Sequence, residues 1–159
     1  MKLSHLDELG RARMVDVSAK PESERTAVAE GAVRMSQPAF DAVAQQTVTK
    51  GDVLAVAEVA GTMAAKRTGE LIPLCHPIGL DLVQVEARLE PELPGVRINA
   101  LARATGRTGV EMEALTAVAV ACLTVYDMVK AIDRGMSIEQ VRLLSKTGGS
   151  RGDWRRTEE

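Results

Sequence analysis

The sequence predicts an α+β domain in which helices cover one face of an antiparallel sheet. Apolar and polar residues alternate, as they do in half-buried strands, over residues 25–35, 82–90 and 96–105. Apolar residues recur instead with helical spacing over residues 52–67 and 110–134. The chain has 159 residues, of which 45% are hydrophobic, so it is long enough to bury a core of its own.

The first part of the chain leads into the first long strand. Residues 1–24 are polar and mixed in character, with one short strand expected at 14–17. Lys20 and Pro21 mark a break, because proline cannot donate a backbone hydrogen bond to a sheet. We therefore expect a partly flexible N-terminal segment before the strand at 25–35.

Two helix signals follow this strand. Ser36 followed by Pro38 predicts a helix start, because proline is favoured in the first turn of a helix. The second helix is expected from about Asp52 to Arg67, with Asp52 as its N-cap. Residues 71–77 read LIPLCHP, and the two prolines exclude a regular helix there.

The second half of the chain predicts a hairpin and then the longest helix. Residues 91–95 supply the prolines and glycine of a turn between the last two long strands. The helix at 110–134 is expected to open with a capping box formed by Thr108 and Glu111, and to close at Gly135. Since a last strand follows at 138–144, the order is β-α-α-β-β-α-β. That order is the split βαβ arrangement of ferredoxin-like folds.

The sequence divides into three parts on composition. Residues 1–24 form the N-terminal segment, residues 25–145 the ferredoxin-like domain, and residues 146–159 a basic, glycine-rich tail. Aliphatic residues dominate the expected core, since the chain contains 22 alanines and 18 valines. Such small side chains bury little area each, so additional burial by self-association is expected.

Charge and composition exclude several classes of protein. A net charge of −2 and only 2% aromatic residues argue against a nucleic-acid binder that relies on phosphate neutralisation or base stacking. No apolar stretch reaches the ~18 residues of a membrane span, and Asp7 and Glu8 interrupt any signal peptide. With only Cys75 and Cys122 present, a disulfide scaffold and a zinc site are not expected, and a reduced, cytoplasmic protein is.

Several polar residues could carry chemistry or serve structure alone. His76 lies between prolines in a rigid loop, where it could face a ligand or cap local carbonyls. Lys50 precedes a helix start, where a phosphate is favoured, although a solvated lysine is the commoner case. Asp127 and Lys130 share a helix face and form an expected i,i+3 pair, either for proton transfer or as a surface ion pair. The tail at 146–152, KTGGSRG, has the composition of a phosphate cradle but lacks P-loop spacing.

Three long blocks and one short one resemble a known family. They are KGDVLAVAEVAGTMAAKRTGELIPLCHP (50–77), TGRTGVEMEALTAVAVACLTVYDMVKAID (105–133), VRLLSKTGGSRGD (141–153) and MVDVSAK (14–20). Together they resemble the MoaC family of cyclic pyranopterin monophosphate synthases, which act in molybdenum cofactor biosynthesis. The resemblance implies a lyase that converts 3′,8-cyclo-7,8-dihydroguanosine 5′-triphosphate to cyclic pyranopterin monophosphate and releases pyrophosphate. It also implies a ferredoxin-like fold and a homohexamer, a trimer of dimers with sites at subunit interfaces.

The resemblance also implies roles for individual residues. Asp127 matches the family's catalytic aspartate, and Lys50 and Lys130 match essential lysines. The residues that match its substrate-binding positions are Leu74, Cys75, His76, Met112 and Glu113. Lys66, Lys146 and Arg25 match triphosphate contacts. At Ser150 and Arg151 the tail departs from the lysine expected after its glycines, which leaves the tail's phosphate contacts open.

The chemistry that the resemblance implies can proceed with lysine and carboxylate proton transfer alone. No tightly bound cofactor or metal is therefore expected, although Mg²⁺ could accompany the triphosphate. Glu113 and Asp127 lie 14 positions apart on one helix, which is roughly 21 Å. We therefore expect each site to combine residues of two chains. A ligand-binding regulatory module is the main alternative, and an RNA-binding domain of the same topology is a weaker one.

Overall fold

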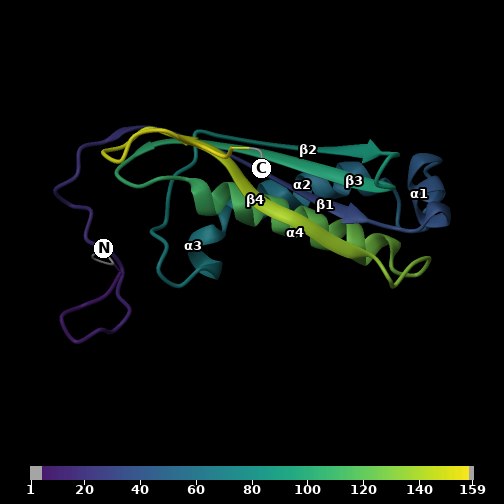
Figure 1. Cartoon of the computed structure of the whole chain (residues 1–159), viewed down its shortest axis with the longest axis horizontal. Coiled ribbons are helices and arrows are strands. Elements are labelled where there is room, and N and C mark those ends of the chain that lie inside the picture. Colours follow the sequence, from purple (N-terminus) through teal and green to yellow (C-terminus); the bar gives the residue numbers. More distant parts are fainter. Residues whose placement is uncertain (1–4, 158–159) are drawn as a thin grey trace.

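The computed structural model, which describes residues 5–157, has two layers: an antiparallel sheet and helices packed on one of its faces (Figure 1). The strands are β1 (Ser23–Arg34), β2 (Leu82–Glu90), β3 (Gly95–Gly106), β4 (Ser137–Thr147) and β5 (Trp154–Arg155). The helices are α1 (Gln37–Ala44), α2 (Val53–Lys66), α3 (Thr68–Leu71) and α4 (Glu111–Val129).

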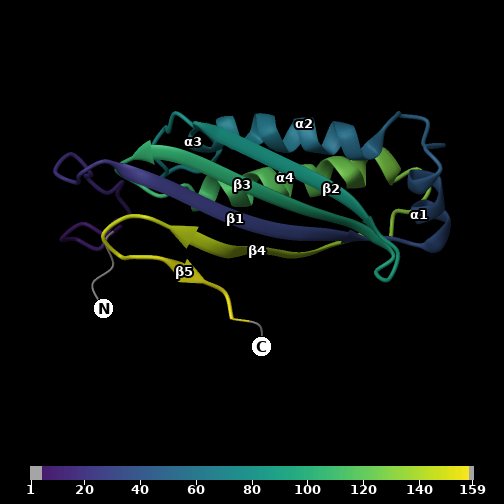
Figure 2. The ribbon, with the colours of Figure 1, turned by 90° about the horizontal axis from the view of Figure 1, so that it is seen from above.

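The strands lie in the order β2-β3-β1-β4-β5, and every neighbouring pair is antiparallel (Figure 2). The connections from β1 to β2 and from β3 to β4 both cross the same face, and they carry α2 and α4. This arrangement confirms the expected α+β, ferredoxin-like fold with helices on one face. The short α3 and β5 were not predicted, because neither is long enough to show a periodic pattern.

Small residues let the layers approach closely. Ala27 lies opposite Ala102, and Ala29 lies opposite Ala100, on the buried face of the two central strands. Helix α4 lays its own alanines and valines against this surface and against α2. A side chain of ordinary size at these positions would separate the layers, so the alanine-rich composition follows from the thin core.

The two long helices approach each other closely at Gly61 of α2. A Cβ atom there would lie 2.8 Å from the carbonyl oxygen of Ala117 on α4 and 3.2 Å from the Cβ of Ala121. Because the nearest atom belongs to backbone, it cannot rotate aside. Gly61 therefore sets the spacing of α2 and α4.

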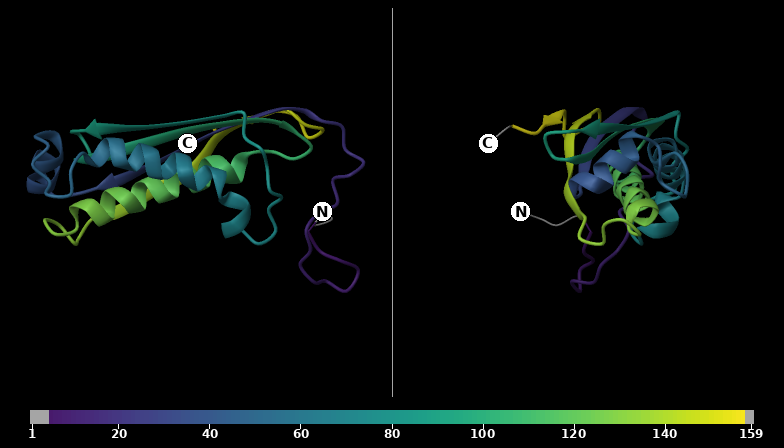
Figure 3. Two further views of the ribbon diagram at one scale, coloured as in Figure 1. Left: turned by 180° about the vertical axis from the view of Figure 1, so that it is seen from behind. Right: turned by 90° about the vertical axis from the view of Figure 1, so that its right-hand side faces the viewer.

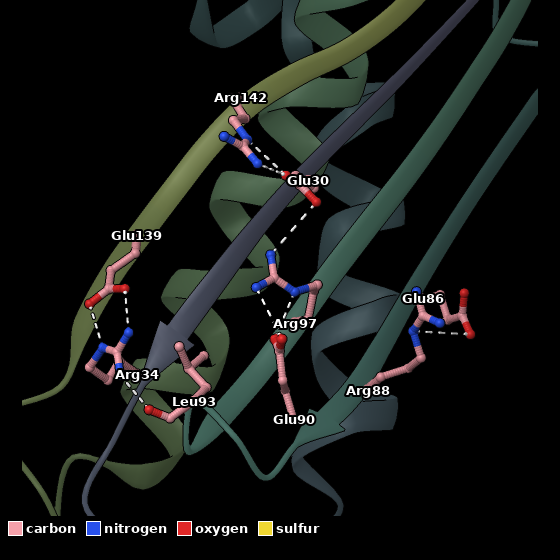
Figure 4. Close-up of polar contacts among 9 residues, drawn as sticks. All are labelled: Glu30, Arg34, Glu86, Arg88, Glu90, Leu93, Arg97, Glu139 and Arg142. Carbon is pink, nitrogen blue, oxygen red and sulfur yellow. Dashed lines mark hydrogen bonds and ion pairs between the residues drawn. The ribbon is translucent and has the colours of Figure 1, made fainter. Parts of the chain in front are cut away.

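The opposite face of the sheet is held by ion pairs (Figure 4). Glu30 of β1 accepts a hydrogen bond of 2.7 Å from the Nε of Arg142 on β4. On its other side, Glu30 lies 3.6 Å from the guanidinium of Arg97 on β3, which also donates to Glu90 at 2.7 Å. These cross-strand pairs link the three central strands and favour their register.

Both ends of α4 differ from the sequence prediction. The N-cap is Val110 and has no side-chain hydrogen bond, so the expected capping box of Thr108 and Glu111 was wrong. The helix ends at Val129 rather than near residue 134. Beyond Val129 the chain turns, and the backbone N–H of Ile132 donates to the Val129 carbonyl at 2.8 Å. The Asp133 carboxylate then accepts the backbone N–H groups of Ser36 and Gly135, at 2.8 Å each.

The strand expected at 14–17 was also wrong. In this part of the N-terminal segment the backbone lies beside no partner strand. The carbonyl oxygen of Val15 instead lies 2.8 Å from Nε2 of His76. Its hydrogen-bond partner is therefore a side chain and not the backbone of a neighbouring strand.

Helix α4 is long and apolar enough to cross a membrane by length and composition alone. More than half of its apolar stretch is buried against the sheet and α2, and the central helix of a folded domain passes the same test.

Candidate functional site

A cavity of about 390 Å³ lies at the end of the sheet where α4 begins. Four segments distant in sequence enclose it: the N-terminal segment, the loop after α3, the start of α4, and the loop between β4 and β5. The first and last of these segments lie at the same end of the molecule in Figures 1 and 3. Residues predicted to bind substrate line this cavity together: Leu74, Cys75, His76, Met112 and Glu113.

Glu113 is the buried acid of the cavity. It lies in the first turn of α4 and is 3% exposed. Burial disfavours its charged form and raises the pKa of Glu113 to about 7, and the nearby charge of Glu111 acts in the same direction. Near neutral pH this carboxyl group can therefore donate or accept a proton.

Cys75 and His76 face the same cavity from the loop after α3. Burial, and next the charge of Glu113, raise the pKa of the Cys75 thiol, so it is protonated at neutral pH and is a poor nucleophile. A carbonyl oxygen can only accept, so the contact between His76 and Val15 requires Nε2 to carry a hydrogen. In neutral His76, Nδ1 is then left as an acceptor.

Cationic side chains line the same cavity as the buried acid. Those that line the cavity are Lys20, Arg25, Arg107, Lys146 and Arg151. Lys146 and Arg25 were predicted phosphate contacts, whereas Lys66 lies elsewhere, in a groove between α2 and β2. Arg107 was missed from sequence, although its place just before the start of α4 was a signal, since anions are favoured at helix N-termini.

Lys50, Asp127 and Lys130 form a second cluster at the other end of α4. The Asp127 carboxylate lies 2.7 Å from the Nζ of Lys50 and 2.7 Å from the Nζ of Lys130. Hydrogen bonds from Lys130 and then Lys50 lower the pKa of Asp127 to about 2. The expected pair of Asp127 and Lys130 is confirmed, and its side chains are about half exposed rather than buried.

Local structure brings Lys50 to this position. Asp52 is the N-cap of α2, as predicted, and its side chain accepts a hydrogen bond of 3.0 Å from the backbone N–H of Ala55. The loop just before this cap carries Lys50 to the last turn of α4. There the Lys50 ammonium also donates to the backbone carbonyl of Asp127 at 2.9 Å. A cation at a helix C-terminus complements the helix dipole.

The two groups of predicted residues do not meet within one chain. Glu113 and Asp127 lie in the first and last turns of α4, 14 positions apart along the helix, which is roughly 21 Å. Seen from behind, α4 runs along the sheet towards the end that carries α1 (Figure 3). A nucleotide in the cavity of one chain therefore does not reach Asp127 of that chain.

The cavity has the donor set of an anion site. Among residues 5–157, no three His, Cys, Asp or Glu side chains converge in a group able to hold a metal ion. Five guanidinium and ammonium groups line the cavity together with the carboxyl groups of Glu111 and Glu113. Guanidinium and ammonium groups bind phosphate through charge-assisted hydrogen bonds.

Comparisons with known proteins cover nearly the whole chain. A family model described as the MoaC family matches residues 14–149. The cyclic pyranopterin monophosphate synthases of Brucella ovis and Brucella melitensis biotype 2 are each 57% identical over 153 residues, which is 96% of this chain and 93% of theirs. The synthase of Brucella suis biovar 1 is 56% identical over the same shares.

Proposed function

This chain belongs to the MoaC family, and we propose that it is a cyclic pyranopterin monophosphate synthase of molybdenum cofactor biosynthesis. It converts 3′,8-cyclo-7,8-dihydroguanosine 5′-triphosphate to cyclic pyranopterin monophosphate and pyrophosphate. The identity of 57% over 96% of the chain to curated synthases carries this conclusion. This identity does not favour the alternative, a ligand-binding regulatory module without enzymatic activity.

Phosphate chemistry is one half of the reaction. To form a cyclic monophosphate, a hydroxyl group of the substrate gives its proton to a base, its oxygen bonds to the α-phosphorus, and the bond to the β-phosphate oxygen breaks. Pyrophosphate then leaves with the electron pair of that bond. Cations around the cavity, among them Arg25 and Lys146, are suited to neutralise the charge on the triphosphate.

Proton transfer is the other half. We propose Lys50, Asp127 and Lys130 as the acid–base set, with His76 and Glu113 orienting the base of the nucleotide. Asp127 is held ionised between two ammonium groups, so it fixes both lysines in place. A lysine can give up and regain a proton during ring opening and closure, which requires no redox cofactor.

We propose that two chains combine to form each site, within a homohexamer built as a trimer of dimers. The cavity and the acid–base cluster lie at opposite ends of α4, so one chain alone cannot apply both to one substrate. Large apolar side chains are exposed on the outer faces of α2 and α4: Val56, Val59, Met63, Met112 and Leu123. An antiparallel copy packed on this face of α4 would bring Glu113 of one chain towards Asp127 of the other.

We further propose that the enzyme has no tightly bound cofactor and works in the cytoplasm. Any Mg²⁺ then arrives with the triphosphate as part of the substrate. The cations that line the cavity support the absence of a bound metal ion, because ammonium and guanidinium groups bind phosphate oxygens and not metal ions.

Incubation with the cyclic nucleotide triphosphate tests the proposed function. The expected result is release of one pyrophosphate for each cyclic pyranopterin monophosphate formed, with both products identified by mass spectrometry. Boiled enzyme is the matched blank. Binding of the nucleotide without release of pyrophosphate would instead identify a ligand-binding module.

A further inference from the structure

Arg25 is held at the cavity from two sides. Its Nε donates to the carbonyl oxygen of Gly106, at the end of β3, at 3.3 Å. Its other side lies against the loop between β4 and β5. Among the described residues no carboxylate lies within 4.0 Å of the Arg25 guanidinium. Its positive charge therefore remains available to an anion in the cavity.

Gly149 is the residue of the loop that lies against this guanidinium. A Cβ atom at position 149 would overlap Nη1 of Arg25 and would lie 2.8 Å from its Cζ. The same glycine has φ of +87°, in the left-handed region that side chains disfavour. Two hydrogen bonds fix the loop around it: Gly148 N–H to Asp153 at 3.0 Å, and Gly152 N–H to the Gly149 carbonyl at 3.1 Å.

A side chain at position 149 would act on the guanidinium rather than on the fold. Nη1 is the far end of a flexible side chain, so it can move aside at small cost. By contrast, a Cβ at Gly148 would overlap the backbone carbonyl of Glu24, which cannot move without the strand. Substitution at 149 therefore displaces the charged guanidinium group of Arg25, whereas substitution at 148 disturbs the backbone of β1.

We infer that Gly149 is a positioning residue, and that its missing side chain lets Arg25 present its guanidinium to a phosphate group of the substrate. The inference rests on the proposed function, because that function supplies the triphosphate. A departure from the expected lysine at Ser150 is compatible with it, since the cation at this wall of the cavity comes from β1.

Gly152 provides a matched control in the same loop. Its φ is +71°, so alanine there meets a similar backbone strain, but no atom lies within 4 Å of a Cβ at this position. Gly149→Ala and Gly152→Ala then differ mainly in the overlap with Arg25. Arg25→Ala, alone and combined with Gly149→Ala, shows whether the glycine acts through the arginine.

Binding of inorganic tripolyphosphate, measured by titration calorimetry on the full chain, is the test. We expect Gly149→Ala and Arg25→Ala each to raise the Kd by about tenfold to a hundredfold, as for loss of a charge-assisted hydrogen bond. The double variant should bind no more weakly than Arg25→Ala, and Gly152→Ala should stay within about twofold of the wild type.

Several outcomes would overturn the inference. They are wild-type affinity in Gly149→Ala, a double variant in which the two losses multiply, and a wild-type protein that does not bind tripolyphosphate. If Gly149→Ala does not fold, the double variant must fold, because removal of Arg25 frees the space; failure of both overturns the inference. Wild-type protein that binds tripolyphosphate but forms no pyranopterin contradicts only the proposed function.

Discussion

Lys50 and Asp127 are 77 positions apart in sequence, and their side chains meet at 2.7 Å. The contact joins the loop before α2 to the last turn of α4, and Lys130 completes the cluster from the same helix. One carboxylate therefore holds two ammonium groups. Such an arrangement fixes the lysines in place while leaving about half of each side chain exposed to an incoming substrate.

Lys50→Ala and Lys130→Ala should each lower turnover by at least ~100-fold, the usual contribution of a general acid or base. Arginine at either position should fail as well, because a guanidinium keeps the charge but does not give up its proton at working pH. Turnover is measured by pyrophosphate release, and folding by circular dichroism.

The matched control for these lysine variants is Arg88→Ala. Arg88 lies on the outer face of the sheet and forms an exposed pair with Glu86 at 3.7 Å (Figure 4). Its loss should leave turnover unchanged. A lysine variant that retains near wild-type turnover would remove that lysine from the acid–base set.

Glu113→Gln should remove part of the pH dependence of stability. Burial raises the pKa of Glu113 from 4.5 to about 7, so between these values the folded chain holds a proton that the unfolded chain has lost. The stability due to this group is full below pH 4.5 and is lost as the pH rises through 7. Between pH 4.5 and 8, the free energy of unfolding of the wild type should therefore fall by up to ~3 kcal/mol more than that of the variant.

Urea unfolding of both proteins across this range measures the difference. At the acidic end the difference between the two proteins should be smallest, because Glu113 is then neutral in the folded chain and only half ionised in the unfolded chain. If the free energies of unfolding of wild type and variant change in parallel with pH, then Glu113 ionises in the folded protein as it does in water.

The sequence predicted the long strands, α2 and the topology because each depends on a periodic pattern that local residues carry. Its errors at the ends of α4 have a different cause. Just beyond the end of the helix, the Asp133 side chain binds the backbone N–H of Ser36, 97 positions away, a contact that no local pattern marks. Likewise, only the folded chain reveals that Arg25 is held between Gly106 and Gly149, since nothing in the local sequence marks that contact.

In the candidate site, too, some features could be predicted from sequence and others depend on contacts between distant parts of the chain. Family motifs predicted five of the residues that line the cavity, and the fold brings them together. Helical spacing also predicted the pair of Asp127 and Lys130. Neither the family motifs nor the helical spacing could predict that Glu113 is buried. Its burial depends on how the start of α4 packs against a loop from another part of the chain.

Gly61→Ala should destabilise the fold although alanine favours helices. The substitution gains about 1 kcal/mol of helix propensity, but the added methyl meets the carbonyl oxygen of Ala117 and pushes α2 and α4 apart. A net loss of about 1–2 kcal/mol in the free energy of unfolding is expected, measured by urea denaturation. An increase in stability would mean that the helices separate at little cost.

Glu113→Ala and Asp127→Ala should complement each other when their subunits are mixed. Each variant alone should be inactive, since each lacks one part of every site. If the site combines the start of α4 from one chain with the end of α4 from its partner, some mixed sites contain neither substitution. Partial recovery of turnover after subunit exchange is then expected, with exchange followed by mass spectrometry of differently labelled chains. No recovery despite proven exchange would count against a shared site, and active isolated monomers of the wild type would exclude it.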